Sequence, residues 1–203
     1  MKRFEEVIII GAGGHAKVIA DIIIESGDEV LGFLDDAPSN NKFFFRRILG
    51  KVEDAVKFRD DAKFIIGIGN NETRKQIAEK YDLEWYTAIH PTAVIGLDVN
   101  IGVGSAVMAK AVINTGTMIG RHCIINTASV VEHDNNIAGY VHISPGVMVG
   151  GTVDIGERTH IGIGAAIKNN LSITSGCLIG AGAVVVKDIQ EQGTYVGVPA
   201  VKK

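Results

Sequence analysis

The tripeptide Glu132-His133-Asp134 combines the side chains that proton transfer requires. A carboxylate beside a histidine raises the basicity of the imidazole and fixes its tautomer, which suits a general base near neutral pH. The other interpretation is that Glu132 and Asp134 are solvated surface charges and that His133 is an ordinary turn residue. The residue types alone leave both interpretations open.

The tripeptide lies within a six-residue repeat. An aliphatic β-branched residue recurs at every sixth position from Ile89 to Val185 without a break. The stripe of an α-helix recurs at three and four residues and that of a half-buried strand at two. A period of six therefore predicts short strands with a turn after each, all pointing one side chain inward. Such a coil repeat indicates a solenoid.

This pattern resembles the hexapeptide repeat of the left-handed parallel β-helix transferases, in which three hexapeptides form one triangular coil. We assign this domain to residues 85–203. The left-handed sense is implied by the resemblance, because crossovers are otherwise right-handed. Residues eighteen apart would be neighbours at the ~4.8 Å spacing of paired strands. The expected columns are Asn126 with Ser144 and Gly162, Thr115 with His133 and Gly151, and His142 with His160.

Residues 1–84 read as a separate small α/β domain with a parallel sheet, because strands alternate with helices. The expected elements are strands at Val7–Ile10, Glu29–Leu34 and Lys63–Ile68, a helix ending near Gly27, and a helix over Glu72–Lys80. The apolar face of the first helix is predicted to consist of Val18, Ile19, Ile22, Ile23 and Ile24. The segment Ala37–Lys51, with its Phe43–Arg47 core, fits equally well as partner-facing surface or as packing under the sheet.

The turn after the first strand has two functional interpretations. Gly11-x-Gly13-x-x-Ala16 between a strand and a helix is the dinucleotide signature, with Asp35 or Asp36 at the distance of a ribose-binding acid. A domain of this size is about half of a full dinucleotide fold and suits one nucleotide better. The N–H groups of Gly13 and Gly14 would then bind phosphate at the helix N-terminus. His15 would contact the phosphate or the sugar, or would simply be exposed.

The composition excludes several protein classes. The 203 residues are 46% apolar with a net charge of −3, which predicts a folded soluble protein with no electrostatic case for nucleic acid. Apolar runs such as Val7–Ile10 are too short to span a membrane, and Met1–Glu6 leaves no room for a signal peptide, so the cytoplasm is expected. Cys123 and Cys177 occupy small-residue positions of the repeat, so core packing is expected rather than a disulfide or metal site.

A closer resemblance covers nearly the whole chain. The motifs that carry it are Gly14-His15, Leu34-Asp35-Asp36, Gly69-Asn70-Asn71, Asn126-Thr127, Glu132-His133-Asp134, His142 and Gly197-Val198-Pro199-Ala200. They look like the acetyltransferases that act on nucleotide-linked amino sugars, similar to the UDP-4-amino-sugar N-acetyltransferases of bacillosamine synthesis and to sialic acid O-acetyltransferases.

The resemblance implies roles for particular residues. The position of His133 accepts the proton of the sugar amine, and that of Asp134 increases its basicity. The position of His142 contacts the acetyl thioester, and the N–H near Gly151 would be the oxyanion donor. The substrate-binding residues implied are Gly13, Gly14, His15, Asp35, Asp36, Gly69 and Asn126.

The resemblance also implies a homotrimer, with CoA in the groove between adjacent β-helices at the positions of Ile163 and Ala181. We therefore expect direct, acetyl-CoA-dependent N-acetylation of the 4-amino group of a UDP-linked amino-deoxy sugar in glycan biosynthesis. The alternatives are a sialic acid O-acetyltransferase and a non-catalytic scaffold that binds sugar nucleotides. No metal is expected, because the β-helical carbonic anhydrases bind zinc through a His-x-x-x-x-His spacing that this chain lacks.

Overall fold

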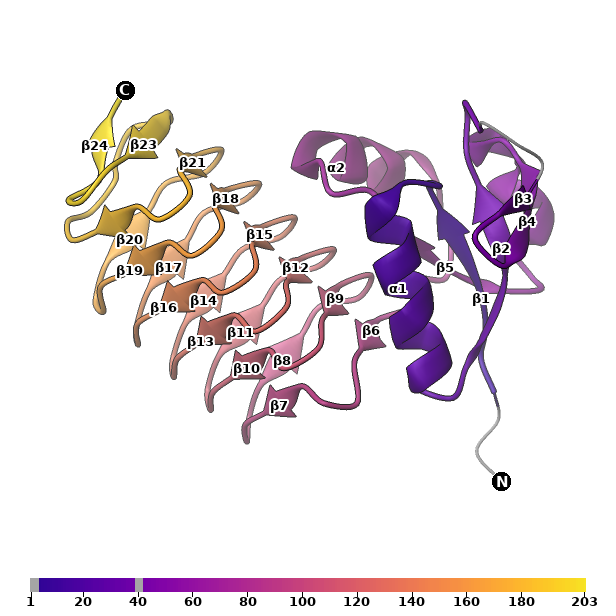
Figure 1. Cartoon of the computed structure of the whole chain (residues 1–203), viewed down its shortest axis with the longest axis horizontal. Coiled ribbons are helices and arrows are strands. Elements are labelled where there is room, and N and C mark those ends of the chain that lie inside the picture. The colour runs from indigo at the N-terminus through magenta and orange to yellow at the C-terminus, as the bar shows by residue number, and fades with distance from the viewer. Residues whose placement is uncertain (1–3, 39–41) are drawn as a thin grey trace.

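The computed structural model describes residues 4–38 and 42–203, which form an α/β unit followed by a β-helix (Figure 1). Residues 1–3, within the Met1–Glu6 start, and residues 39–41, within the segment Ala37–Lys51, lie outside the described residues. The α/β unit contains a five-stranded sheet of order β3-β4-β2-β1-β5. Its elements are β1 (Glu6–Ile10), α1 (Gly14–Glu25), β2 (Glu29–Leu34), β3 (Lys42–Phe43), β4 (Arg46–Gly50), a 3-10 helix (Val52–Phe58), β5 (Lys63–Ile66) and α2 (Asn71–Lys80).

The predicted parallel sheet is confirmed, since β1 pairs in parallel with both β2 and β5. The third strand ends at Ile66, two residues before the predicted end. The segment that the sequence could not place supplies two further strands: β3 and β4 form a hairpin, and β4 extends the sheet beside β2. Phe43 of this hairpin packs edge-on against Phe33, at 4.9 Å between ring centroids.

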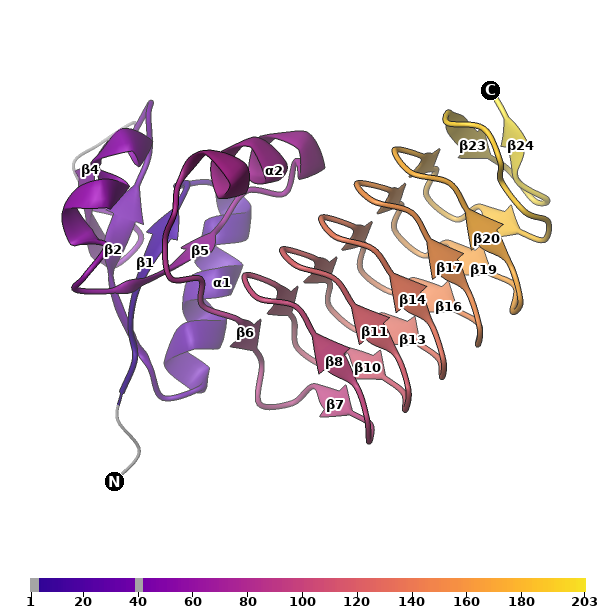
Figure 2. The ribbon, with the colours of Figure 1, turned by 180° about the vertical axis from the view of Figure 1, so that it is seen from behind.

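Helix α1 lies between the sheet and the first coils of the β-helix in both views of the ribbon (Figures 1 and 2). Its buried residues are Ala16, Ile19, Ala20, Ile22 and Ile23. The prediction of Val18 and Ile24 on this face is wrong, because they are 40% and 46% exposed. Positions 16, 19, 20 and 23 follow the helical period, and the two alanines allow close approach to both neighbours.

The β-helix consists of short strands, almost all of two residues and paired in parallel, in three sheets, an arrangement consistent with the predicted left-handed β-helix. Face 1 contains β6 (Ala88–Ile89), β9 (Ala106–Val107), β12 (Ile124–Ile125), β15 (His142–Ile143), β18 (His160–Ile161), β21 (Leu178–Ile179), β23 (Thr194–Val196) and the antiparallel β24 (Val201–Lys202). Face 2 contains β7 (Val94–Ile95), β10 (Val112–Ile113), β13 (Val130–Val131), β16 (Met148–Val149), β19 (Ala166–Ile167) and β22 (Val184–Val185). Face 3 contains β8 (Asn100–Ile101), β11 (Met118–Ile119), β14 (Asn136–Ile137), β17 (Asp154–Ile155) and β20 (Ser172–Ile173).

The second residue of most of these strands points into a continuous core, as the six-residue period predicted. Residues eighteen apart pair directly, for example Val131 with Val149 and His142 with His160. Cys123 and Cys177 are buried and free, as predicted. Across the described ranges, 4–38 and 42–203, none of the helices has the length and apolar character needed to cross a membrane.

Candidate active site

His133 and Asp134 form the turn between faces 2 and 3, directly after β13. The His133 Nδ1 atom lies 2.8 Å from Asp134 Oδ2, and both side chains are more than half exposed. An ionised carboxylate can only accept, so Nδ1 carries a proton and donates it to Asp134. The Nε2 atom is then left with a lone pair that no described residue uses. This geometry suits a general base.

Two buried polar side chains hold this turn in place. The Asn135 Nδ2 group donates to the Glu132 carbonyl, and its Oδ1 accepts from Val153 N–H at 2.8 Å. The Thr117 hydroxyl also donates to the Glu132 carbonyl, at 2.8 Å. The sequence interpretation missed Asn135. The sequence signal that could have found it is an amide at a position that elsewhere in the repeat holds a small or apolar residue. The structure shows that this amide is buried.

Two glycines leave room for the His133–Asp134 pair. A Cβ at Gly151 would lie 2.7 Å from His133 Nε2, and one at Gly116 would lie 2.5 Å from Asp134 Oδ1. Gly116 also has a φ of +73°, which favours glycine. Gly151 lies one coil from His133 in the predicted column, and its N–H has no acceptor among residues 4–38 and 42–203. A donor and a base therefore lie side by side at this corner.

A second polar group lies on face 1. The Asn126 amide nitrogen is 3.0 Å from His142 Nε2, and its oxygen accepts from Thr127 N–H at 2.8 Å. This places the amide N–H toward the ring, so His142 Nε2 accepts and Nδ1 carries the proton. The His142 ring stacks on His160 at 4.5 Å between ring centroids, and the His15 ring centroid lies 6.4 Å from that of His142. His15 is thus mostly buried against the β-helix rather than simply exposed.

The histidines of this group are held neutral. Burial lowers the pKa of His142 to about 3, assisted by His160, Arg74 and His15 and opposed by the Gly69 backbone. Burial and Arg74 lower the pKa of His15 to about 4. Burial followed by Arg74 also lowers the pKa of His160. This part of face 1 therefore presents uncharged imidazoles at neutral pH.

The nucleotide motif lies beside a cavity of about 200 Å³ lined by Ala12, Gly13, Asp35, Ala37, Pro38, Phe43 and Ile48. Gly13 is the N-cap of α1 and lines this cavity, so the N-terminus of α1 lies at its edge. Asp35 accepts from Ala12 N–H at 2.7 Å and from Ala37 N–H at 2.9 Å. The carboxylate of Asp36 points elsewhere: it accepts from Val52 N–H at the start of the 3-10 helix.

A larger cavity of about 930 Å³ lies at the amino ends of β1, β2 and β5. Its walls are mostly acidic, with residues such as Glu5, Asp28 and Asp60. Acidic walls repel phosphates, so the smaller cavity beside Gly13 suits a nucleotide better.

The chain does not bring all predicted site residues together. His133, Asp134 and Gly151 lie at the corner between faces 2 and 3, which is opposite face 1 in a three-sided coil. Face 1 carries His142, and Asn126 follows its strand β12. These two residues therefore do not neighbour His133 within one chain. The physical reason is that the whole width of face 2 separates position 126 from position 133.

The remaining predicted positions take two places. Ile163 and Ala181 are exposed at the corner between faces 1 and 2, after β18 and β21. Gly69 lies in the turn before α2, close to His142. Within the described part of the chain, no three His, Cys, Asp or Glu side chains cluster closely enough to hold a metal ion.

Comparison with known proteins gives consistent results. A family model described as the PglD N-terminal domain matches residues 6–81. The UDP-N-acetylbacillosamine N-acetyltransferase of Bacillus subtilis is 38% identical over 112 residues, which cover 52% of each chain. The GDP-perosamine N-acetyltransferase of Escherichia coli O157:H7 is 31% identical over 159 residues, which cover 71% of this chain and 70% of that one. In one further curated relative the matched stretch makes up only 24% of that relative's own length.

The architecture matches solved structures over its full length. The acetyltransferase domain of PglB from Neisseria gonorrhoeae, in complex with acetyl coenzyme A, superposes with a TM-score of 0.94 at 35% identity. The match covers 99% of this chain and all of that domain.

The buried histidines predict that the protein loses stability in mild acid. The folded state holds His15, His122 and His142 neutral, with pKa values of about 4, 4 and 3, whereas the unfolded chain takes up protons below its ordinary 6.5. The stabilisation is present above pH 6.5 and is lost as the pH falls. The free energy of unfolding should drop by up to about 1.4 kcal/mol per pH unit for each ring.

Urea denaturation at about pH 7.5, 6 and 5 measures this slope. His122→Asn should reduce it, because asparagine tolerates the φ of +52° at this position and removes one titrating ring. Equal stability at all three pH values would contradict the prediction.

Proposed function

The chain belongs to the PglD-type hexapeptide-repeat sugar N-acetyltransferases, and from this membership we propose that it acetylates the 4-amino group of a nucleotide-linked amino-deoxy sugar with acetyl-CoA. The observation that carries the proposal is the His133 corner, where a free Nε2 lone pair lies beside the Gly151 backbone and Asp134 holds the opposite ring nitrogen. A UDP-linked sugar is the first candidate because of the Bacillus subtilis relative. A GDP-linked sugar is the second because of the Escherichia coli relative.

The corner supports direct transfer. The uncharged amine attacks the thioester carbonyl, a C–N bond forms, and His133 Nε2 takes the amine proton. The Gly151 N–H is placed to stabilise the negative oxygen of the tetrahedral intermediate. The C–S bond then breaks, and the CoA sulfur leaves with its electron pair and takes a proton from the imidazolium. A thiol nucleophile is disfavoured, because Cys123 is buried and burial raises its pKa to about 12.

The separation of the two polar groups favours a site shared between copies. The His133 corner of one copy would meet face 1 of a neighbour, where Asn126 and His142 lie. The outward residues of face 2 support self-association, because all are apolar and all are partly or fully exposed. They are Val94, Val112, Val130, Met148, Ala166 and Val184. A homotrimer would cover this stripe and place CoA beside Ile163 and Ala181.

The α/β unit would supply the nucleotide site. Phosphate would bind the N–H groups of Gly13 and Gly14 at the N-terminus of α1. Phe43 offers an aromatic wall, and Lys17 lies 5.3 Å from its ring centroid. Asp35 lines the cavity, with lone pairs remaining after its two backbone contacts. Asp36 is not part of this proposal, since its carboxylate caps the 3-10 helix.

Replacement of His133 tests the chemistry. His133→Ala should lower kcat by about 10²- to 10⁴-fold, because the amine proton loses its acceptor. Steady-state kinetics with acetyl-CoA and a UDP-4-amino sugar measure the effect. His90→Ala, at a half-buried histidine that follows β6, is the control and should keep the activity. A His133→Ala protein with nearly normal kcat and unchanged assembly would remove the assignment of the base.

A mixing experiment tests whether the site is shared. Gly13→Asp should fold, because a Cβ there meets no described atom within 4 Å and aspartate is a good N-cap. Its charge should repel the phosphate, so Gly13→Asp and His133→Ala should each be inactive. Co-expression of the two variants should restore activity. Each mixed trimer should have about one third of the activity of a wild-type trimer, because one of its three shared sites is intact. No recovery in purified mixed assemblies would place each site within one chain.

A substrate panel tests specificity. UDP- and GDP-linked 4-amino sugars should be N-acetylated, whereas free or CMP-linked sialic acid should not. O-acetylation of sialic acid alone would reverse the assignment. Calorimetry distinguishes the scaffold alternative, which predicts nucleotide binding without any binding of acetyl-CoA.

A further inference from the structure

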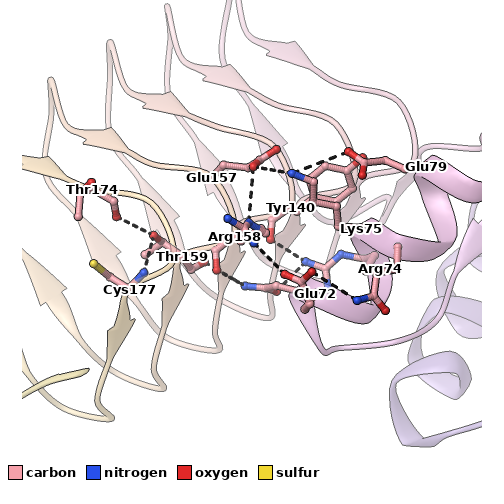
Figure 3. Close-up of polar contacts among 12 residues, drawn as sticks. Glu72, Arg74, Lys75, Glu79, Tyr140, Glu157, Arg158, Thr159, Thr174 and Cys177 are labelled. Carbon is pink, nitrogen blue, oxygen red and sulfur yellow. Dashed lines mark hydrogen bonds and ion pairs between the residues drawn. The ribbon is translucent and has the colours of Figure 1, made fainter. Parts of the chain in front are cut away.

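Arg74 is the most deeply buried charged residue of the described chain, with 1% of its surface exposed. It extends from α2 into the junction between the two units (Figure 3). Five hydrogen bonds engage its guanidinium: Nε to the His122 carbonyl at 2.8 Å, Nη1 to the Ile68 and Gly69 carbonyls at 3.1 Å, and Nη2 to Asn71 Oδ1 at 2.8 Å and the Tyr140 carbonyl at 3.0 Å. Its donors are thus fully used.

The charge of Arg74 has no counterion. Among residues 4–38 and 42–203 no carboxylate lies within ion-pair distance of it, whereas the neighbouring Lys75 and Arg158 pair with Glu157 and Glu72 at 2.8 and 2.9 Å. A buried charge without a partner is costly, and burial lowers the pKa of Arg74 to about 10. Neutral carbonyls therefore hold an uncompensated cation inside the molecule.

The hydrogen bonds join the turn that precedes α2 to two coils of the β-helix. The Ile68 and Gly69 carbonyls belong to the turn, and the His122 and Tyr140 carbonyls belong to consecutive coils at the corner between faces 3 and 1. Arg74 thereby fixes Gly69 beside His142. A lysine could keep the charge, but its single ammonium could not reach all of these carbonyls.

The charged and titratable groups around His142 come from three elements. His15 lies on α1, Arg74 on α2 and His160 on β18, and each of them disfavours a charged His142 ring. The remaining polar neighbours are the neutral Asn126 amide and the Gly69 backbone. No carboxylate acts on this ring from these elements. The His142 Nδ1 and His15 Nε2 atoms are buried and lack partners among the described residues.

We propose that Arg74 is a positioning residue of the acceptor-sugar site: its hydrogen bonds to the turn and to two coils of the β-helix fix the Gly69 turn beside the His142 ring. The identity of the acceptor sugar rests on the proposed function. The position of the Gly69 turn does not.

NMR titration of the ring nitrogens provides the test, with His142→Gln used to assign the signals. In the wild-type protein His142 should be the neutral Nδ1–H tautomer at pH 7. In Arg74→Gln the ring nitrogen signals of His142 at pH 7 should shift, because the Gly69 turn beside the ring loses its hydrogen bonds to the guanidinium. Arg74→Lys should shift them as well, because a lysine cannot reach all of these carbonyls. Lys75→Gln, at the same interface but paired and more exposed, should leave the ring unchanged.

Kinetics separate positioning from simple destabilisation. Arg74→Lys should raise KM for the sugar nucleotide about tenfold while KM for acetyl-CoA changes little, because only the Gly69 side of the site is loosened. Unchanged His142 ring signals in a folded Arg74→Gln protein would overturn the proposal. So would a normal KM for the sugar nucleotide in Arg74→Lys, which keeps the charge and provides the test even if Arg74→Gln does not fold. If no sugar is acetylated but the ring responds as expected, the proposed function fails and the role of Arg74 stands.

Discussion

The inward aliphatic residue at every sixth position is the constraint on which the rest of the structure depends. Because most of these side chains fill the interior of the β-helix, the backbone cannot slip by one residue without exposing the core to water. The register therefore fixes what lies above and below every side chain. Gly151 beside His133 and His160 beside His142 are direct consequences of this spacing.

The same register limits what one chain can assemble. Corners repeat at intervals of eighteen residues, so residues on one corner form a column but never reach the face opposite. His133 and His142 are nine positions apart in sequence and belong to different sides of the coil. A site that uses both must therefore draw them from two copies. The apolar outward stripe of face 2 gives such copies a reason to associate.

The six-residue period predicted the β-helix, its domain and its columns of residues eighteen apart, because this spacing is local in the sequence and recurs along it. It could not predict the junction between the units, which depends on how α1 and α2 pack on face 1. Val18 and Ile24 illustrate this failure, because being apolar does not decide which side of α1 is covered. Asp35 and Asp36 were equivalent in the sequence, and only the fold separates a cavity residue from a helix cap. Arg74 gave no signal, as an arginine in an amphipathic helix ordinarily faces solvent.

The polar junction explains how a small nucleotide domain can serve chemistry on a rigid rod. Apolar packing of α1 on Ala88, Ala106 and Ile124 holds the units together but is not directional. The carbonyl contacts of Arg74 are directional, and the ion pairs of Lys75 and Arg158 add to them at the surface (Figure 3). The Gly69 turn thus keeps one position relative to face 1. Because the β-helix sets the position of the His133 corner just as firmly, association of copies alone would bring the two halves of the site together without rearrangement of either unit.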